Sequence, residues 1–274
     1  MTRAARSRSW WAALGMFTVV PAPPMALEGD TAGRALRWLP AVGLLLAVPA
    51  AGIMFAAEIS GGSVLHRLLA STLAVAVLAL LTGGLHLDGL ADTADGLASR
   101  RPPDEALALM RRGDTGPLGV ATLILVLLLQ ITSLAALPAG LPAAAALVLA
   151  AVTARVAVVQ CSGAAFPAAR PEGFGSLVAG GTPVQARLTT MITLLVAVVV
   201  TGELNGGIRL AGLGLCAASA GLLAGGLLCR TARARLGGVT GDVFGAVIEV
   251  ATTATLVALA TLSLSTRGHA DGAG

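Results

Sequence analysis

Long runs of apolar residues alternate along the chain with short segments rich in Gly, Pro, Arg and Asp. A helix needs about 20 mostly apolar residues to cross the hydrocarbon core of a bilayer. The candidate spans are residues 39–57, 66–84, 118–137, 141–161, 188–203, 208–229 and 243–265. The pattern predicts an all-α, polytopic integral membrane bundle of about seven transmembrane helices, with six or eight as the alternatives. All 274 residues then form a single integral membrane domain.

The two ends of the chain fall outside these spans. The apolar stretch Trp10–Val20 is too short to cross a bilayer, and its two adjacent Trp residues with nearby arginines are typical of an interfacial helix. It ends in prolines without a good cleavage site, which argues against a secretory signal. We therefore expect residues 1–38 to be a cytoplasmic or interfacial segment and residues 266–274 to be a polar C-terminal tail.

Composition agrees with the membrane interpretation. Hydrophobic residues make up 56% and charged residues 12% of the chain, with a mean hydropathy of +0.86, which excludes an ordinary soluble domain and a disordered chain. The net charge of +4 comes from 18 basic residues, all arginine, in short clusters between apolar runs, so no nucleic-acid partner is expected. Cys161, Cys216 and Cys229 lack metal-binding spacing and are interpreted as small buried hydrophobic residues.

The arginines predict an orientation in the membrane. They are concentrated in alternate connections, which the positive-inside rule places in the cytoplasm together with the N-terminus. These connections are residues 1–38, 85–117, 162–187 and 230–242. Most acidic residues fall on the same side, namely Asp88, Asp92, Asp95, Asp104, Glu105, Asp114, Glu172 and Asp242. We therefore expect a cytoplasmic active site on a protein of the plasma or inner membrane.

The most informative segment is Gly83–Leu97, within the acidic active-site loop expected over residues 85–117. On a helix, Asp88, Asp92 and Asp95 follow the i, i+4, i+7 spacing that places three carboxylates on one face. Two carboxylates about 6 Å apart repel by roughly 3 kcal/mol at an effective dielectric of about 20, so the group requires cations. Hard oxygen ligands beside small residues suit Mg²⁺, which commonly bridges carboxylates to substrate phosphates.

Two simpler interpretations of this segment remain open. The aspartates can form a polar helix end that is balanced by neighbouring arginines such as Arg100 and Arg101. His86 is equally ambiguous, since it can bind phosphate, act as a general base or only lie at the interface.

Two glycine-rich turns have a similar character. Arg111, Arg112 and Asp114 precede the third span, where guanidinium groups suit phosphate oxygens, although flanking positive charge is the simpler explanation. Thr240 and Asp242 open the last span, and Glu249 lies about 10 Å deeper on the same helix face. A carboxylate at such depth is costly and indicates function, a polar contact between helices being the alternative.

The segment Thr82–Leu97, with its LHLDGLADTADGL core, closely resembles the signature of the cobalamin synthase family, the adenosylcobinamide-GDP ribazoletransferases. The other segments that resemble the family occur in the same order and are Phe17–Pro23, Leu39–Leu45, Asp114–Gly116, Ala154–Arg155 and Gly237–Asp242. The chain departs from the family pattern after Asp114, where a serine-arginine-isoleucine-glycine run is usual. It also departs after Asp242, where Glu249 is the acidic residue that remains along the helix.

The resemblance implies a Mg²⁺-dependent transferase. Adenosylcobinamide-GDP would react with α-ribazole, or with its 5′-phosphate, to give adenosylcobalamin or its 5′-phosphate and GMP, a late step of cobalamin biosynthesis. The catalytic residues would be Asp88, Asp92, Asp95 and His86, the three aspartates also holding the metal. The substrate-binding residues would be Arg111, Arg112, Asp114, Arg155, Thr240, Asp242 and Glu249. The partners are these substrates and the lipid bilayer, and homo-oligomerisation is left open.

Two other classes compete with this interpretation. A CDP-alcohol phosphotransferase also uses interfacial aspartates and Mg²⁺, and Gly96–Arg100 imitates part of its pattern, but the two widely spaced downstream aspartates are missing. A cation-coupled transporter typically carries its charges near the bilayer midplane and often contains an inverted repeat. Here the carboxylates gather at one face, and no internal repeat is apparent.

Overall fold

The computed structural model describes residues 3–25, 29–61, 63–137 and 143–271, and within these ranges the regular structure is helical apart from one isolated bridge between Ala168 and Val239. The shorter helices are α1 (Arg3–Phe17), α2 (Gly29–Ala35), the 3-10 helix η1 (Leu36–Trp38), α5 (Leu85–Ala98), α6 (Pro103–Leu109) and α9 (Phe174–Val178). The longer helices are α3 (Leu39–Ile59), α4 (Val64–Leu81), α7 (Pro117–Ala136), α8 (Ala143–Cys161), α10 (Val184–Asn205), α11 (Ile208–Leu236) and α12 (Gly241–Asp271). This arrangement confirms the all-α prediction.

Seven helical segments of the described chain are long and apolar enough to cross a membrane, as predicted. They are Thr31–Ile59, Val64–Leu81, Pro117–Ala136, Ala143–Cys161, Val184–Asn205, Ile208–Leu236 and Gly241–Leu264. The fifth, predicted to be short, has 22 residues, and the sixth continues seven residues beyond its predicted end at 229. Arg, Ala and Leu are good helix formers, so α11 extends past the point where its apolar run stops.

The regions expected between and after the spans contain further helix. Residues 85–117, expected as a loop, form α5 and α6 with short connections. Much of the tail expected at 266–274 continues α12, and residues 272–274 lie outside the described residues, as do residues 141 and 142 at the predicted start of the fourth span.

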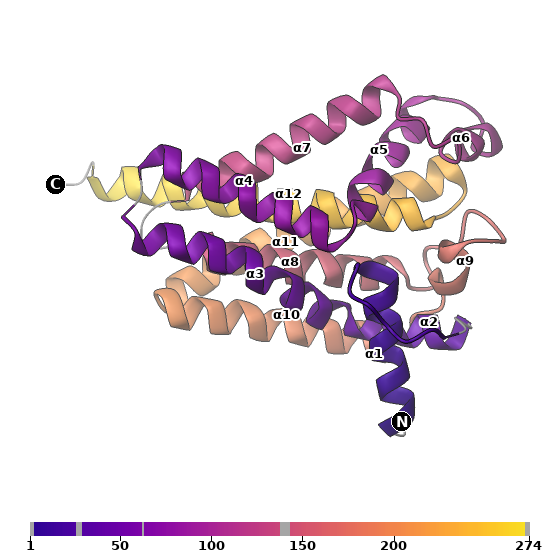
Figure 1. Ribbon diagram of the computed structural model, residues 1–274, viewed down its shortest axis with the longest axis horizontal. Coiled ribbons are helices and arrows are strands. Elements are labelled where there is room, and N and C mark those ends of the chain that lie inside the picture. The colour runs from indigo at the N-terminus through magenta and orange to yellow at the C-terminus, as the bar shows by residue number, and fades with distance from the viewer. Residues whose placement is uncertain (1–2, 26–28, 62, 138–142, 272–274) are drawn as a thin grey trace.

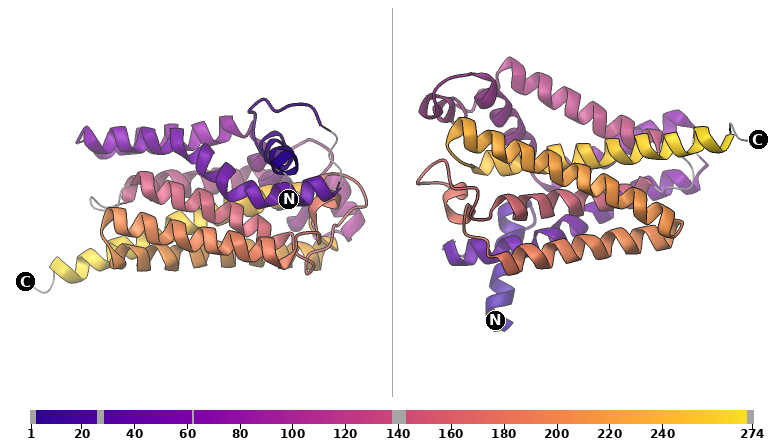
Figure 2. Two further views of the ribbon diagram at one scale, coloured as in Figure 1. Left: turned by 90° about the horizontal axis from the view of Figure 1, so that it is seen from below. Right: turned by 180° about the vertical axis from the view of Figure 1, so that it is seen from behind.

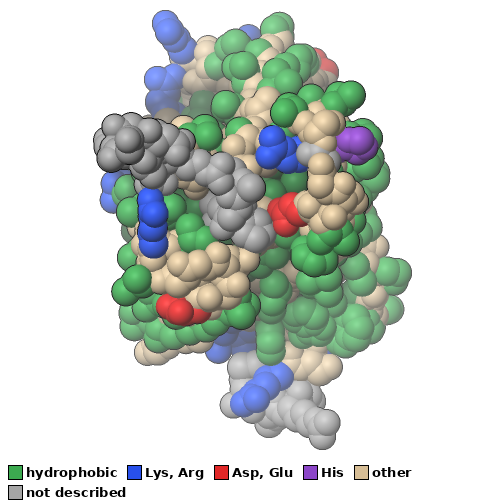
Figure 3. All heavy atoms as spheres, turned by 90° about the vertical axis from the view of Figure 1, so that its left-hand side faces the viewer, with side chains coloured by type: hydrophobic (Ala, Val, Ile, Leu, Met, Phe, Trp, Pro, Cys, Tyr) green, Lys and Arg blue, Asp and Glu red, His purple; other side chains and the backbone are tan. Residues whose placement is uncertain are grey.

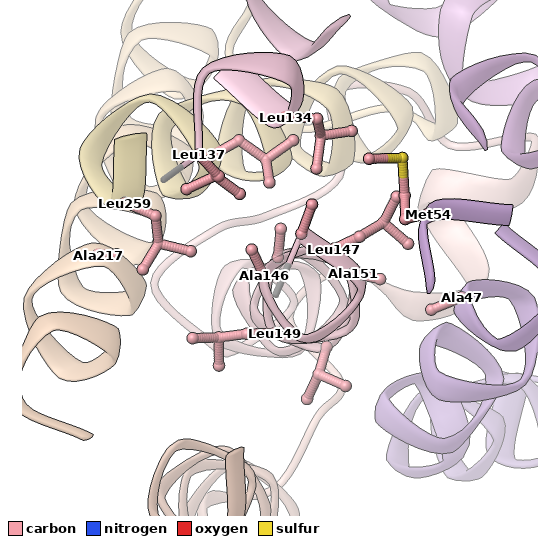
Figure 4. Close-up of a cluster of buried hydrophobic side chains, with 14 of the residues drawn as sticks. Ala47, Met54, Leu134, Leu137, Ala146, Leu147, Leu149, Ala151, Ala217 and Leu259 are labelled. Carbon is pink, nitrogen blue, oxygen red and sulfur yellow. The ribbon is translucent and has the colours of Figure 1, made fainter. Parts of the chain in front are cut away.

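Helix α8 lies at the centre of the bundle. Figure 4 shows it nearly end-on, with Leu147 and Leu149 pointing outward toward the surrounding helices α3, α7, α11 and α12. Alanine is its commonest residue, and small side chains let neighbouring helices approach closely, which favours helix association in a bilayer. The side chains facing outward from the bundle are large and apolar, as at Leu125 on α7 and Ile192 on α10. Such a surface matches lipid rather than water.

The two ends of the bundle differ in character. The start of α12 lies beside α5, α6 and α9 at one end, which we call the acidic end (Figure 1). The face toward the opposite end, near the C-terminus, is largely hydrophobic with scattered charged side chains (Figure 3). Helix α1 runs across the bundle near the acidic end, while α10 and α11 cover the face seen from behind (Figure 2). Helix α1 thus runs transverse to the long helices, and the interfacial position of Trp10–Val20 stays a prediction.

Candidate active site

The acidic end is organised around α5, which begins at a tight turn. Gly83 and Gly84 adopt positive φ angles of 60° and 73°, a conformation that glycine reaches at little cost, and they turn the chain sharply after α4. Helix α5 then runs through Ala98, so that Asp88, Asp92 and Asp95 share one face as their spacing predicts. Asp88 is exposed, whereas Asp92 and Asp95 are half-buried.

Asp92 lies where negative charge accumulates. Burial and the neighbouring carboxylates of Asp88, Asp242 and Asp95 raise the pKa of Asp92 to about 6, against a smaller opposing effect of Arg170. Burial disfavours the charged form of a carboxyl group, and nearby like charges add to this effect. Asp92 is therefore the point on α5 where a cation or a hydrogen-bond donor would relieve the most repulsion.

Asp95 has a different environment from the other two aspartates. Its Oδ2 accepts a hydrogen bond from the backbone N–H of Gly116 at 2.7 Å, and its Oδ1 accepts one from Gly119 at 2.9 Å. Glycine suits both positions, since a Cβ on Gly116 or Gly119 would press against the Asp95 carboxylate and displace it from these hydrogen bonds. Both oxygens of Asp95 thus hold the beginning of α7 against α5. Its assignment as a metal ligand stays a prediction.

Close packing against α5 places the second acidic element. A Cβ on Gly89 would lie only 2.7 Å from the backbone oxygen of Asp242, and one on Gly245 would lie 3.2 Å from His86 Cα. Glycine at these positions lets α5 and the first turns of α12 approach closely. Thr240 caps α12 by accepting a hydrogen bond from the N–H of Val243 at 3.2 Å, and its hydroxyl donates to Asp242 Oδ2 at 3.2 Å.

The connection between α8 and α10 contributes a residue that the sequence did not single out. Arg170 interacts electrostatically with Asp242, Asp92 and Arg111, and its Nη2 donates a hydrogen bond to the backbone oxygen of Leu107 at 2.7 Å. Arg170 therefore places a positive charge within electrostatic range of carboxylates on both α5 and α12. Its charge was visible in the sequence, but its position beside Asp92 depends on how the connection folds back over the bundle.

A second group of predicted residues lies inside the bundle. Gln130 of α7 donates hydrogen bonds from Nε2 to Glu249 Oε2 at 2.9 Å and to Thr253 Oγ1 at 3.1 Å. Arg155 of α8 and His86 line the same small cavity as Glu249, about 20 Å³ in volume, enough for one water molecule. Gln130 and Thr253 were missed by the sequence analysis. A polar amide in the middle of an apolar span was the available signal for Gln130.

His86 belongs to this buried polar group. Only 3% of its side chain is exposed, and burial, with a smaller effect of Arg155, lowers its pKa well below the ordinary value. The imidazole is therefore neutral, and its 4.0 Å separation from Glu249 Oε1 is not an ion pair. This environment favours a role for His86 in positioning α5 against α12 rather than in direct contact with a substrate.

The remaining predicted residues lie on the connection before α7. Arg111, Arg112 and Asp114 are all exposed. Arg111 lies near enough to Arg170 for their two positive charges to repel each other, whereas no side-chain hydrogen bond of Arg112 or Asp114 occurs in the described part of the chain. The predicted residues thus separate into three sets. The surface group is Asp88, Asp92, Asp95, Asp242 and its partner Thr240, the buried group is His86, Arg155 and Glu249, and the exposed turn carries Arg111, Arg112 and Asp114.

The surface group has the chemistry of a magnesium site that shares its ion with a substrate. Among the described residues, no three His, Cys, Asp or Glu side chains are close enough to hold a metal by themselves. Mg²⁺, however, commonly uses one or two carboxylates together with substrate phosphates. Asp88 and Asp92 supply hard oxygen donors one helical turn apart, and their mutual repulsion favours a cation. The residues therefore fit Mg²⁺ if the substrate supplies the other ligands.

Known proteins match the chain over most of its length. The model of the cobalamin-5-phosphate synthase family matches residues 9–260. The adenosylcobinamide-GDP ribazoletransferase of Nocardioides sp. is 39% identical over 257 residues, covering 92% of this chain and 98% of the relative. The enzymes of the same name from Frankia casuarinae and Escherichia coli are 35% and 36% identical, covering 90% and 92% of this chain and 92% and 99% of the relatives. No solved structure matches the chain.

Proposed function

Because the chain belongs to the cobalamin-5-phosphate synthase family, we propose that it catalyses the adenosylcobinamide-GDP ribazoletransferase reaction at its acidic end. The observation that carries the assignment of the site is the convergence of Asp88 and Asp92 of α5 with Asp242 of α12. Burial and these neighbouring carboxylates together raise the pKa of Asp92 to about 6. This concentration of carboxylates, with Arg170 beside it, suits a substrate that brings phosphate groups and a cation.

The reaction transfers a phosphorus-linked group. The 3′-hydroxyl oxygen of α-ribazole, or of its 5′-phosphate, attacks the corrinoid-linked phosphorus, and the bond from that phosphorus to the bridging oxygen breaks. GMP leaves with the bridging oxygen and the electron pair of that bond. We assign acceptance of the hydroxyl proton to Asp242, because one of its oxygens is already held by Thr240 beside the α5 carboxylates. Stabilising the charges that develop in such a displacement is mainly an electrostatic task.

Asp88 and Asp92 would hold Mg²⁺ in this proposal. When bound there, the ion would supply positive charge to neutralise the diphosphate oxygens and the leaving GMP. Asp95 then keeps the beginning of α7 in place through its two backbone hydrogen bonds, and Arg170 balances Asp92 and Asp242.

The site faces the cytoplasm in this proposal, in the plasma or inner membrane. Arg100, Arg101, Arg111 and Arg112 adjoin the spans at the acidic end, and positively charged connections remain in the cytoplasm. The soluble nucleotide substrate would then reach the acidic end directly from the cytoplasm.

The reaction can be tested directly. Purified protein in lipid should convert adenosylcobinamide-GDP and α-ribazole into adenosylcobalamin, with one GMP released per product and only in the presence of a divalent cation. α-Ribazole 5′-phosphate is included as a second acceptor. A CDP-alcohol phosphotransferase would instead release CMP from a CDP-linked lipid precursor, and a transporter would release no nucleotide. Failure with both acceptors in a folded, metal-replete preparation would exclude the proposed reaction.

A further inference from the structure

A cavity of about 130 Å³, lined by both polar and apolar groups, opens beside the carboxylates of the acidic end. One wall is the connection from Arg170 to Ser176, and the other is the turn from Val239 to Asp242 that leads into α12. The volume holds several water molecules, which matches a ring the size of a sugar better than a whole nucleotide.

The two walls are joined by backbone hydrogen bonds. The N–H of Ala169 donates to the oxygen of Val239 at 3.0 Å, and the N–H of Val239 donates to the oxygen of Pro167 at 2.9 Å. The walls also touch closely, since a Cβ on Gly175 would lie 3.0 Å from Thr240 Cα. The cavity is therefore formed before any ligand arrives, which lowers the entropic cost of binding.

The charges around the cavity decide which ligand it suits. Arg170 carries one positive charge, whereas Glu172 and Asp242 carry two negative charges, so the lining is negative overall. Such a lining repels a free phosphate but accepts hydrogen bonds from hydroxyl groups, as acidic side chains do from ribose in dinucleotide-binding folds. Ser176 and Thr240 add two hydroxyl groups to the wall.

The cavity is also lined by an aromatic side chain, Phe174, on the wall formed by Arg170–Ser176. The ring of Phe174 is held edge-on by Phe17, with ring centroids 5.4 Å apart, and by Phe244, at 6.5 Å. Its half-buried side chain leaves apolar surface toward the cavity. A sugar ring presents hydroxyl groups on its edge and C–H groups on its face. Carboxylates can accept hydrogen bonds from the hydroxyl groups, and the aromatic ring of Phe174 can pack against the C–H face.

We propose that this cavity binds a ribose ring, with Glu172 accepting a hydrogen bond from the 2′-hydroxyl and Asp242 facing the 3′-hydroxyl. The proposal rests on the proposed function and names the subsite of its acceptor. The ribose of α-ribazole carries the attacking hydroxyl itself and must therefore lie against the reacting carboxylates. The guanosine ribose is separated from the reacting phosphorus by the leaving phosphate, so it belongs farther away.

The contact between Glu172 and the 2′-hydroxyl is tested by changing the substrate and the enzyme separately and together. With the wild-type enzyme, replacing α-ribazole by 2′-deoxy-α-ribazole should raise KM about tenfold, the usual effect of losing a hydrogen bond to a charged group. In Glu172→Gln the KM for α-ribazole should rise by a similar factor, and the penalty for removing the 2′-hydroxyl should largely disappear. Glu105→Gln is the matched control, an exposed glutamate at the same end, on α6 and outside the cavity, and it should preserve the wild-type penalty.

A binding measurement separates this proposal from the reaction itself. Calorimetric titration of the purified wild type and Glu172→Gln with α-ribazole alone, and with GMP alone, requires no turnover. Weakened binding of α-ribazole with unchanged binding of GMP supports the acceptor subsite. Weakened binding of GMP alone, or no change for either ligand, overturns it. Absence of GMP release by the wild type would reject the proposed function, while the titrations would still decide the ligand of the cavity.

Discussion

At the scale of single residues, Asp92 combines a cost in stability with a proposed role in function. Its pKa of about 6 in the fold lies above the usual value near 3.8, so the folded protein binds its proton more tightly than the unfolded chain does. Stability contributed by the protonated carboxyl is present at low pH and is lost as the pH rises from about 4 through about 6. Solvent screening of the half-buried group limits the effect to about 1 kcal/mol.

Asp92→Asn should therefore stabilise the metal-free protein at neutral pH while removing activity. We expect Tm at pH 7.5 without divalent cations to rise by about 3 °C, and turnover to fall by orders of magnitude. Thermal unfolding of the purified variant between pH 4 and pH 8 measures the first effect, and GMP release measures the second. The wild type should lose stability over the lower half of this range relative to the variant. Retention of normal turnover and Mg²⁺ dependence by Asp92→Asn would contradict the metal assignment.

Asp95 should respond to the same substitution in the opposite direction. An asparagine presents only one acceptor oxygen, so one of the N–H groups of Gly116 and Gly119 would lose its partner and face an NH₂ group. Losing a hydrogen bond to a charged group costs about 1.5–3 kcal/mol, which should lower Tm by about 5 °C.

The Mg²⁺ concentration for half-maximal activity provides the second readout for Asp95. It should stay near the wild-type value in the fraction of Asp95→Asn that remains folded. A large increase in this concentration, without loss of stability, would instead assign Asp95 to the metal.

At the scale of elements, the position of α5 against α12 decides whether the acidic residues converge. A Cβ on Gly89 meets the backbone of Asp242 at 2.7 Å, and backbone atoms can yield only if one helix moves. Gly89→Ala should therefore separate the helices at a cost of about 1–3 kcal/mol and strongly reduce activity.

The matched control for Gly89→Ala lies on α11. Gly226 has no neighbouring atom within 4 Å of an added Cβ, so Gly226→Ala should preserve activity and stabilise the helix by up to about 1 kcal/mol. Tm and GMP release are measured for both variants in the same lipid. Equal behaviour of the two variants would show that close packing at Gly89 is not required.

The sequence predicted correctly those features that depend only on neighbouring residues in the chain. The spans follow from runs of apolar residues, and the shared face of Asp88 and Asp92 follows from helical spacing. The end of α11 was misplaced because a helix continues wherever its residues favour it, while hydropathy stops at the first arginine of the cluster beginning at Arg230. Helix propensity and membrane burial are separate properties, and the predicted end at residue 229 follows from membrane burial alone.

At the scale of the whole molecule, the contacts between segments far apart in the sequence could not be predicted from the sequence. Gln130 and Glu249 lie 119 residues apart and meet only because α7 and α12 pack together. Arg170 lies within electrostatic range of Asp92 because its connection is fixed to the turn before α12 by paired backbone hydrogen bonds. Spacing along one helix contains no information on either contact. The residues of a site on one element were therefore predictable, and their partners were not.

The final prediction concerns the orientation of the entire bundle. Arginines are concentrated in the connections at the acidic end, whereas Glu203 lies at the far end of α10, so the positive-inside rule places the acidic end in the cytoplasm. Single cysteines are introduced as Arg233→Cys at the acidic end and Glu203→Cys at the far end. The background lacks Cys161 and Cys229, which are buried as predicted, and Cys216, which is exposed on α11 and not buried as predicted.

Both introduced positions are exposed, so access is set by the membrane and not by packing. A membrane-impermeant maleimide should label Glu203→Cys in right-side-out vesicles and Arg233→Cys only in inverted vesicles. Labelling of both positions after detergent treatment shows that both thiols are reactive. The reverse pattern would place the carboxylates of α5 outside the cytoplasm, away from a soluble nucleotide substrate, and would overturn the proposed orientation together with the supply route that it implies.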